Sequence, residues 1–178
     1  IKVVTRAYGT VLEVGIGSGL NLPFYSKEHV KHLTAIDPSK ENWNKNTVNI
    51  ESLPFEFEFI VASAESIPAD DNSCDTVVIT YTLCTIPDYK TALSEIRRVL
   101  KKGGKLLFCE HGKAPERAIQ IWQNIINPFW KCVGGGCNLN RDMPLIIEEN
   151  GFKITRMETK YIHGWKPGGY NYWGEAKI

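Results

Sequence analysis

Short apolar segments alternate with polar segments along most of the chain. The mostly apolar segments Val11–Val14, His32–Asp37 and Asp75–Thr80 are each followed by glycine, proline or polar residues, which is typical of buried strands. Phe55–Val61 alternates phenylalanine with glutamate, and this period of two predicts a strand with one less buried face. Lys105–Cys109 predicts a fifth strand, which ends at the sequence Glu-His-Gly.

The segments between these strands predict helices. Leu20–Tyr25 is expected to open a first helix and Ser39–Asn49 to form a second. Pro87–Leu100 is the clearest helix, with Asp88 as its N-cap and Gly103-Gly104 as its stop after two lysines. Its apolar stripe recurs at helical spacing and is expected to face the core. The stripe consists of Ala92, Leu93, Ile96, Val99 and Leu100.

Five strands separated by helical or loop segments predict a parallel sheet with right-handed crossovers. The remaining residues differ in pattern. Pro115–Trp130 predicts an aromatic-rich helix, and Asn140 is expected to cap a short helix that Gly151 ends. Phe152–Ile162 and Tyr170–Ile178 predict a sixth and a seventh strand, joined as an antiparallel pair.

Composition limits the classes of function that need to be considered. The chain has 178 residues and a net charge of +1, so we expect one domain and no nucleic acid as a partner. No apolar run is long enough to span a membrane. Five cysteines without a regular framework favour reduced thiols in the cytoplasm. Cys132 and Cys137 have the spacing of half a metal site, but no second pair accompanies them, so we expect no metal.

The stretch Val11–Gly19 places glycines at 15, 17 and 19 directly after a predicted strand. Glycines in such a turn let the backbone approach a ligand at the carboxyl edge of a parallel sheet. Leu20 stands where a dinucleotide-binding fingerprint would have its third glycine. Asp37 ends the next predicted strand and suits the hydroxyls of a ribose, although it is also a candidate N-cap for the helix that follows.

Several motifs taken together resemble the class I S-adenosylmethionine (SAM) methyltransferases of the type 11 branch. They are Glu13–Gly19, Asp37, Ala64-Glu65, Asp75–Thr80 and Gly103–Glu110. The resemblance implies a Rossmann-like α/β fold with a seven-stranded, mainly parallel sheet, an antiparallel last strand and helices on both faces. It also implies SAM as cofactor and S-adenosylhomocysteine as product.

The carboxyl-terminal part resembles a narrower group, which includes the animal microsomal alkyl-thiol methyltransferases. Glu110-His111, Pro128–Trp130 and Gly136–Arg141 carry this resemblance. Ile16 departs from it, because the animal members have cysteine there, and those members also carry a hydrophobic amino-terminal anchor. Members of the class begin with one or two helices before the first strand, so we expect that such helices are missing before residue 1. We also expect residues 113–150 to form a helical insertion on the substrate side of a single domain, 1–178.

The resemblance implies a set of binding residues. A small residue and an acid at 64 and 65 would flank the adenine, although a solvated loop glutamate is an equal alternative for Glu65. The cofactor-binding set is Glu13, Gly15, Ile16, Gly17, Asn21, Asp37, Pro38, Ala64, Glu65 and Thr80.

Candidate substrate residues follow the same reasoning. Tyr81 would touch the acceptor; Trp122 and Trp130 would wall an apolar pocket, or pack as core. Arg141 would bind an acidic group or pair with a loop carboxylate. His111 is the candidate catalytic residue, as general base or thiolate stabiliser, and the alternative is a structural histidine beside Glu110.

The sequence predicts an enzyme that methylates a small, apolar acceptor, with thiol sulfur preferred. Carbon or nitrogen methylation of a quinone precursor or a phospholipid headgroup is the alternative within enzymes, and a non-catalytic SAM-binding module is the alternative from another class. The expected partner is a small molecule, with peripheral membrane contact as an option. The expected location is the cytoplasm, with membrane association through the missing amino-terminal segment as an option.

Overall fold

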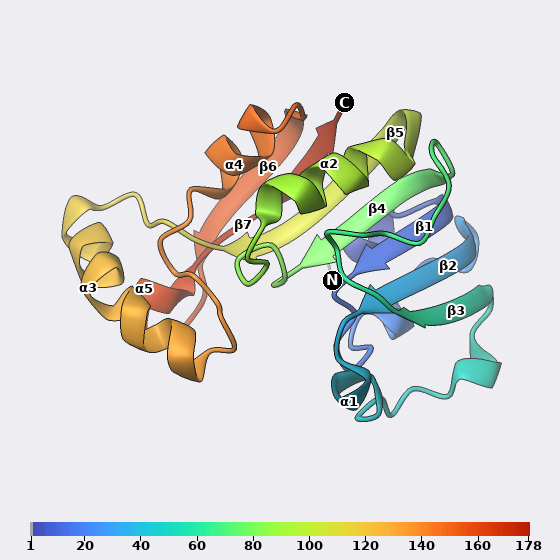
Figure 1. The fold of residues 1–178 in the computed structure, drawn as a ribbon, viewed down its shortest axis with the longest axis horizontal. Coiled ribbons are helices and arrows are strands. Elements are labelled where there is room, and N and C mark those ends of the chain that lie inside the picture. The colour runs from blue at the N-terminus through green and yellow to red at the C-terminus, as the bar shows by residue number, and fades with distance from the viewer. Residues whose placement is uncertain (1) are drawn as a thin grey trace.

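A single twisted sheet organises the computed structural model, which describes residues 2–178 (Figure 1). Its strand order is β3-β2-β1-β4-β5-β7-β6. The pairs joining β1 to β5 are parallel, whereas β7 runs antiparallel to both β5 and β6. The predicted sheet, including its antiparallel last strand, is therefore confirmed. The strands are β1 (Gly9–Val14), β2 (Val30–Asp37), β3 (Glu56–Val61), β4 (Cys74–Thr80), β5 (Leu100–His111), β6 (Lys153–Tyr161) and β7 (Tyr170–Lys177).

Apolar side chains cover both faces of the sheet, because successive residues of a strand point to opposite sides. On one face, Leu12 and Val77 pack in the same cluster as buried residues of helices α2 (Tyr89–Val99) and α4 (Met143–Glu149). On the other face, Val11 and Val78 pack with the 3₁₀ turns η1 (Val4–Arg6) and η2 (Leu22–Phe24). The continuous apolar pattern of β1 and β4 follows from burial on both faces.

Helix α2 begins as predicted but ends earlier. The Asp88 side chain accepts a hydrogen bond from the Thr91 backbone N–H at 3.1 Å, which confirms the N-cap. The prediction that Gly103-Gly104 stops this helix is wrong. Leu100 already has extended dihedral angles and pairs with Cys74, so both glycines lie within β5.

The two helices predicted after β1 and β2 are also wrong. Only the 3₁₀ turn η2 forms at 22–24, where the Asn21 side chain is bonded to Glu13 and Thr80. Only α1 (Lys40–Trp43) forms after β2. Asn46 then bonds through its side chain to both backbone groups of Val48, and such local bonds compete with a helix.

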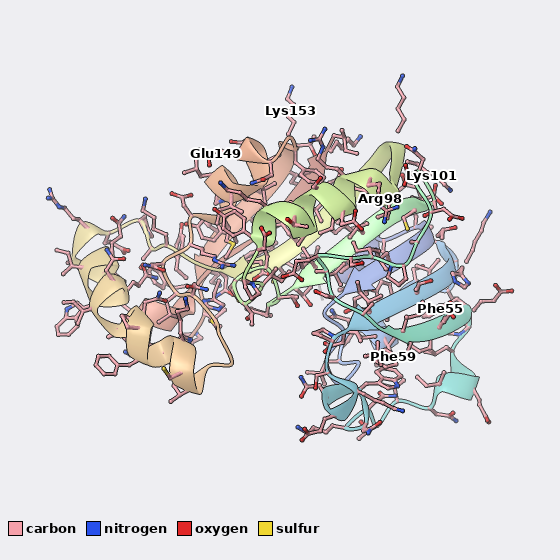
Figure 2. The ribbon with its side chains drawn as sticks, in the orientation of Figure 1. Phe55, Phe59, Arg98, Lys101, Glu149 and Lys153 are labelled. Carbon is pink, nitrogen blue, oxygen red and sulfur yellow. The ribbon has the colours of Figure 1, made fainter. Side chains whose placement is uncertain are left out.

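Aromatic stacking seats α1 against the edge strand. The Trp43 ring stacks on Phe59 of β3 with 4.6 Å between ring centroids, and Phe59 is labelled on that strand in Figure 2. The 3₁₀ turn η3 (Ile50–Ser52) leads from this region into β3. The edge of the sheet beside α1 is therefore held by side-chain packing rather than by a long helix.

The last third of the chain contains α3 (Arg117–Val133), α4 and the short α5 (Lys166–Gly169). The predicted cap Asn140 is wrong: Asp142 accepts from the Leu145 N–H, while the Asn140 side chain donates to Asn124. Gly151, with φ +85°, follows α4 as predicted. Gln123 of α3 is fully buried and its amide donates to the carbonyls of Gly112, Leu139 and Pro167.

Among residues 2–178, no helix has both the length and the apolar character that a membrane crossing requires.

Candidate functional site

A cavity of about 860 Å³ opens at the carboxyl ends of β1, β2 and β4. A volume of this order is typical of sites for small organic ligands. Nine of the ten residues predicted for the cofactor line it, and Tyr81 lines it as well. Glu13 is the exception. The nine are Gly15, Ile16, Gly17, Asn21, Asp37, Pro38, Ala64, Glu65 and Thr80.

Two glycines of the turn after β1 have different structural roles. Both have positive φ, +75° at Gly15 and +55° at Gly17, a conformation that glycine adopts without penalty. A side chain at Gly15 would collide with Thr82, so this glycine lets β1 pack against the loop after β4. A Cβ at Gly17 would meet no protein atom within 4 Å, and Gly17 lines the cavity.

Asp37 joins the turn to the end of β2. Its side chain is 7% exposed. One carboxylate oxygen accepts from the Gly17 N–H at 2.9 Å, and the other accepts from the Ser39 N–H at 2.8 Å. The helix that follows is capped by the Ser39 hydroxyl, so the alternative role of Asp37 as N-cap is wrong.

Glu13 lies behind the cavity wall rather than on it. Its carboxylate is buried and accepts hydrogen bonds from the Asn21 side-chain amide at 2.7 Å and from the Tyr25 hydroxyl at 2.8 Å. Burial raises the pKa of Glu13 to about 7. Asn21 also donates to the Thr80 hydroxyl at 2.9 Å, so Glu13 acts on the cavity by holding Asn21 in place.

Ala64 and Glu65 form the wall after β3. Ala64 is buried, and the Glu65 carboxylate accepts a hydrogen bond from the Ser63 hydroxyl. The Ser63 hydroxyl in turn accepts from the Glu65 N–H at 3.3 Å. Glu65 is therefore held beside the cavity rather than extended into solvent, although the contact to adenine stays a prediction.

The loop after β4 is organised by a residue to which the sequence analysis assigned no role. Glu110 is fully buried, and its carboxylate accepts from the backbone N–H groups of Thr82 and Leu83, each at 2.8 Å, and of Cys84 at 3.2 Å. Burial raises its pKa, and the three backbone hydrogen bonds oppose that shift. A glutamate directly after the apolar run Leu106–Cys109 was the available sequence signal.

Tyr81 begins that loop and lies at the edge of the cavity. It has a positive φ of 50°, and its hydroxyl donates to the Asn171 side-chain oxygen at 2.7 Å. Its ring stacks on His111 with 6.2 Å between centroids. The predicted substrate residue Tyr81 and the predicted catalytic residue His111 are therefore neighbours.

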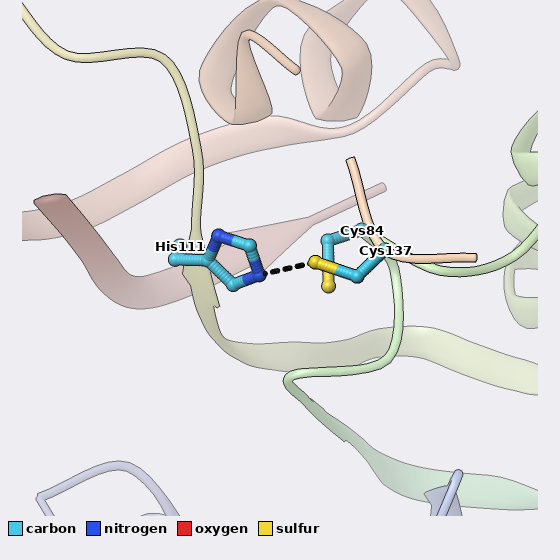
Figure 3. A group of neighbouring side chains, drawn as sticks. All are labelled: Cys84, His111 and Cys137. Carbon is cyan, nitrogen blue, oxygen red and sulfur yellow. Dashed lines mark hydrogen bonds between the residues drawn. The ribbon is translucent and has the colours of Figure 1, made fainter. Parts of the chain in front are cut away.

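His111 belongs to a cluster with two cysteines, Cys84 and Cys137 (Figure 3). The His111 Nε2 atom lies 2.9 Å from the Cys137 Sγ atom, and the indole N–H of Trp130 donates to the same sulfur at 3.3 Å. Hydrogen bonds from Cys84 and His111 lower the pKa of Cys137. The hydrogen bond with Cys137 and burial raise the pKa of Cys84. Cys132, the neighbour of Cys137 in sequence, is exposed and outside the cluster.

The other predicted substrate residues lie outside the cavity wall. Trp122 is 57% exposed on α3. Trp130 contacts Cys137 and packs on Trp165 with 5.3 Å between ring centroids. The Arg141 guanidinium donates to the Leu83 carbonyl and lies 5.0 Å above the Tyr89 ring, so it supports the loop after β4 and does not pair with a carboxylate there.

Comparison with known proteins identifies the family. A family profile described as "Methyltransferase domain" matches residues 12–108, from β1 into β5. The chain belongs to this methyltransferase family. It is an enzyme of the SAM-dependent class, with SAM as cofactor, and the predicted family, fold and enzyme class are confirmed.

Two curated relatives and one solved structure illustrate the similarity. The chain is 35% identical over 173 residues to thiol S-methyltransferase TMT1B of Rattus norvegicus, covering 94% of this chain and 70% of that protein. It is 35% identical to the ubiquinone/menaquinone biosynthesis C-methyltransferase UbiE of Rickettsia prowazekii, covering 90% and 71%. A SAM-dependent methyltransferase from Methanosarcina mazei superposes with a TM-score of 0.73 at 18% identity, covering 98% of this chain and 95% of that one.

The residues around the cavity fit SAM. The cavity has the size for a nucleoside carrying an amino acid, with the Asp37 carboxylate at the end of β2 and the open space above Gly17 on its wall. The carboxyl ends of neighbouring parallel strands, where this cavity lies, are where such folds bind their ligands.

Proposed function

We propose that this enzyme transfers a methyl group from SAM to the thiol sulfur of a small, apolar acceptor. The observation that carries the proposal is the 35% identity, across 94% of the chain, to a protein named as a thiol S-methyltransferase. The position of His111 and Tyr81 beside the cavity supports it, because this pair lies beyond Thr80, at the end where the transferred methyl group would be.

For the cofactor we propose contacts in chain order along the cavity. The backbone at Gly15 and Gly17 approaches the ligand closely, and Asp37 accepts hydrogen bonds from the ribose hydroxyls. Ala64 and Glu65 flank the adenine. When bound, the sulfonium supplies both the electrophilic methyl group and its leaving group, so these residues act by positioning.

For the acceptor we propose that Tyr81 and His111 align the sulfur with the methyl group. A thiolate is a far better nucleophile than a thiol, and an imidazole N–H stabilises a thiolate by hydrogen bonding. His111 Nε2 contacts the sulfur of Cys137, which supports a site built for sulfur. Residues 113–150 supply Trp130 and Cys137 to this end of the site, and we propose that they serve acceptor binding.

An acceptor screen tests the proposal. The enzyme is incubated with SAM and, separately, with alkyl thiols, with a demethylated quinol and with phosphatidylethanolamine vesicles, and S-adenosylhomocysteine is measured against a reaction without acceptor. We expect product with the alkyl thiols. Turnover with the quinol or the vesicles alone would overturn the sulfur assignment, and SAM binding without turnover on any acceptor would indicate a binding module.

The second candidate is carbon methylation of a quinone precursor. It is favoured by the 35% identity to a C-methyltransferase across 90% of the chain. The same screen separates the two candidates, because each predicts product in a different arm.

We further propose that the acceptor is a small molecule and not a nucleic acid, which the net charge of +1 supports. A cytoplasmic location is supported by the five cysteines, all free thiols.

Peripheral membrane contact is supported by an exposed apolar face of α3, formed by Ile121, Trp122, Ile125, Phe129 and Val133. Sedimentation with phosphatidylcholine vesicles tests that contact, and Phe129→Gln should weaken it.

A further inference from the structure

Three donor atoms, two sulfurs and one imidazole nitrogen, converge beside the cavity from three segments that are distant in sequence. Cys84 lies in the loop after β4, His111 ends β5, and Cys137 follows α3 (Figure 3). Their sulfur and Nε2 or Nδ1 atoms lie within 4.8 Å of one another. Both cysteines are buried and the histidine is half-buried. We propose that Cys84, His111 and Cys137 bind a zinc ion whose fourth coordination position is open toward the acceptor.

The donor set matches the coordination chemistry of zinc. Zn²⁺ takes Cys sulfur and His nitrogen in tetrahedral geometry, and three protein ligands leave one position for another ligand. Bonds of about 2.0 to 2.3 Å separate neighbouring ligand atoms by roughly 3.5 Å. The 2.9 Å contact between Cys137 and His111 is shorter than this, and the 4.8 Å limit of the cluster is longer, so small side-chain rotations suffice.

Hydrogen bonds around the cluster hold its two loops together. The Cys84 carbonyl accepts from both the backbone N–H and the side-chain amide of Asn138, each at 2.9 Å. The Glu110 carboxylate accepts from the Cys84 N–H. Trp130 donates to the Cys137 sulfur, and such outer contacts orient metal ligands and tune the metal. These hydrogen bonds therefore hold the segments that carry Cys84 and Cys137 beside each other.

The cluster adjoins the end of the cavity where we place the acceptor. Thr85 and Gly135, close in sequence to Cys84 and Cys137, line the cavity, and the Tyr81 ring stacks on His111. This part of the inference rests on the proposed thiol specificity, and the zinc ion held by His111 takes the place of a direct imidazole hydrogen bond to the thiolate. The acceptor S–H bond breaks and a Zn–S bond forms, with the proton released to solvent. The sulfur then forms its bond to the methyl carbon as the sulfonium C–S bond breaks, and the thioether leaves, because it is a weaker ligand than a thiolate.

Metal titration of the whole chain tests the site without reference to activity. Chelator-treated, reduced protein is titrated with Co²⁺, a spectroscopic substitute, and then with Zn²⁺ in competition. We expect one Co²⁺ per chain, with thiolate-to-cobalt charge-transfer absorption and the intense visible bands of a tetrahedral ion, both lost when Zn²⁺ is added. Cys84→Ala and Cys137→Ala should each weaken binding at least 100-fold, whereas Cys132→Ala, at an exposed thiol outside the cluster, should bind as the unaltered protein does.

Retention of the SAM-induced thermal shift in each variant shows that it has folded. Cobalt bound without thiolate bands, or bound equally by Cys84→Ala, would overturn the site, as would a Cys84–Cys137 disulfide whose reduced form binds no metal. Metal-free enzyme that methylates alkyl thiols at full rate would overturn the delivery role and leave the proposed function intact. One bound zinc in an enzyme that methylates only quinols would support the site and overturn the sulfur assignment.

Discussion

At the scale of single residues, the glycines after β1 show how one motif serves two needs. Gly15 lets the strand end pack against Thr82, while Gly17 leaves space above the turn open. Both need a positive φ, which costs an L-residue about 1 kcal/mol or more. The motif therefore serves the fold at Gly15, where a side chain would collide with Thr82, and ligand binding at Gly17, where the space is left open.

Gly17→Ala should weaken SAM binding by at least tenfold, because Gly17 lines the cavity and the new methyl group takes space that no protein atom fills. Gly103→Ala is the matched control: Gly103 has φ +83° and also has no neighbour within 4 Å of an added Cβ, but it lies in β5 away from the cavity. Calorimetric titration with SAM measures the affinity, and urea unfolding measures the shared strain. Equal SAM affinity in the two variants would contradict the placement of the cofactor over Gly17.

Glu13 should make stability depend on pH in a defined direction. The pKa of Glu13 is about 7 in the folded protein, above the ordinary 4.5. Well below pH 4.5 the carboxyl is protonated in both the folded and the unfolded protein, and the free energy of unfolding is highest. As pH rises toward 7 the unfolded protein loses this proton first, and the free energy of unfolding falls by roughly 3 kcal/mol in total.

Glu13→Gln should remove this decline, because the amide does not titrate and can still bond to Asn21 and Tyr25. Free energies of unfolding in urea at pH 5 and pH 8 measure the effect. Glu58→Gln, at an exposed position on β3, should keep the decline. An unchanged slope in Glu13→Gln would show that another group causes it.

At the scale of elements, helices with a capped, apolar stripe were predictable and loops built on side-chain hydrogen bonds were not. The α2 stripe and its Asp88 cap are local in sequence and are confirmed. The segment 39–49 forms only one short helix. The Asn46 side chain takes up the backbone hydrogen bonds of Val48, and Trp43 stacks on Phe59 of the edge strand. Gly103-Gly104 reads as a helix stop until the pairing of β5 with β4 is known.

Glu110→Ala should destabilise the protein by roughly 3 kcal/mol or more, since it leaves three N–H groups after β4 without an acceptor. It should also lower kcat more than it raises the Kd for SAM, because Cys84 and the loop that follows Tyr81 lose their support. Urea unfolding and steady-state kinetics measure the two effects. Glu149→Ala, at an exposed glutamate of α4, should change neither, and a stable Glu110→Ala would contradict the structural role.

At the scale of the whole molecule, the cofactor cavity joins the ends of three strands and their loops. Ligand bound there should stabilise the fold by mass action, by about 2.7 kcal/mol at a SAM concentration 100 times its Kd. Asp37→Ala should lose most of the rise in Tm, because Asp37 ties the glycine turn to β2. Asp142→Ala, which removes the cap of α4, should lower the Tm but keep the SAM-induced rise, as scanning calorimetry would show.

The sequence by itself determined the family, the cofactor, the strand order along the chain and nine of the residues that line the cavity. These features depend on local patterns: apolar runs that end in glycine, an acid at the end of a strand, and a helix with its cap. A parallel sheet places successive strand ends at one edge, so residues far apart in sequence reach one cavity whenever their strands are recognised. That is why nine predicted residues line it.

Only the tertiary structure decided which side chains meet. Glu13 supports Asn21 from behind the wall, Glu110 organises the loop after β4, and Cys137 pairs with Cys84 and His111 rather than with Cys132. These contacts depend on how loops cross the strand ends, which no local periodicity encodes. Burial then changes the chemistry of the groups, as the raised pKa of Glu13 shows.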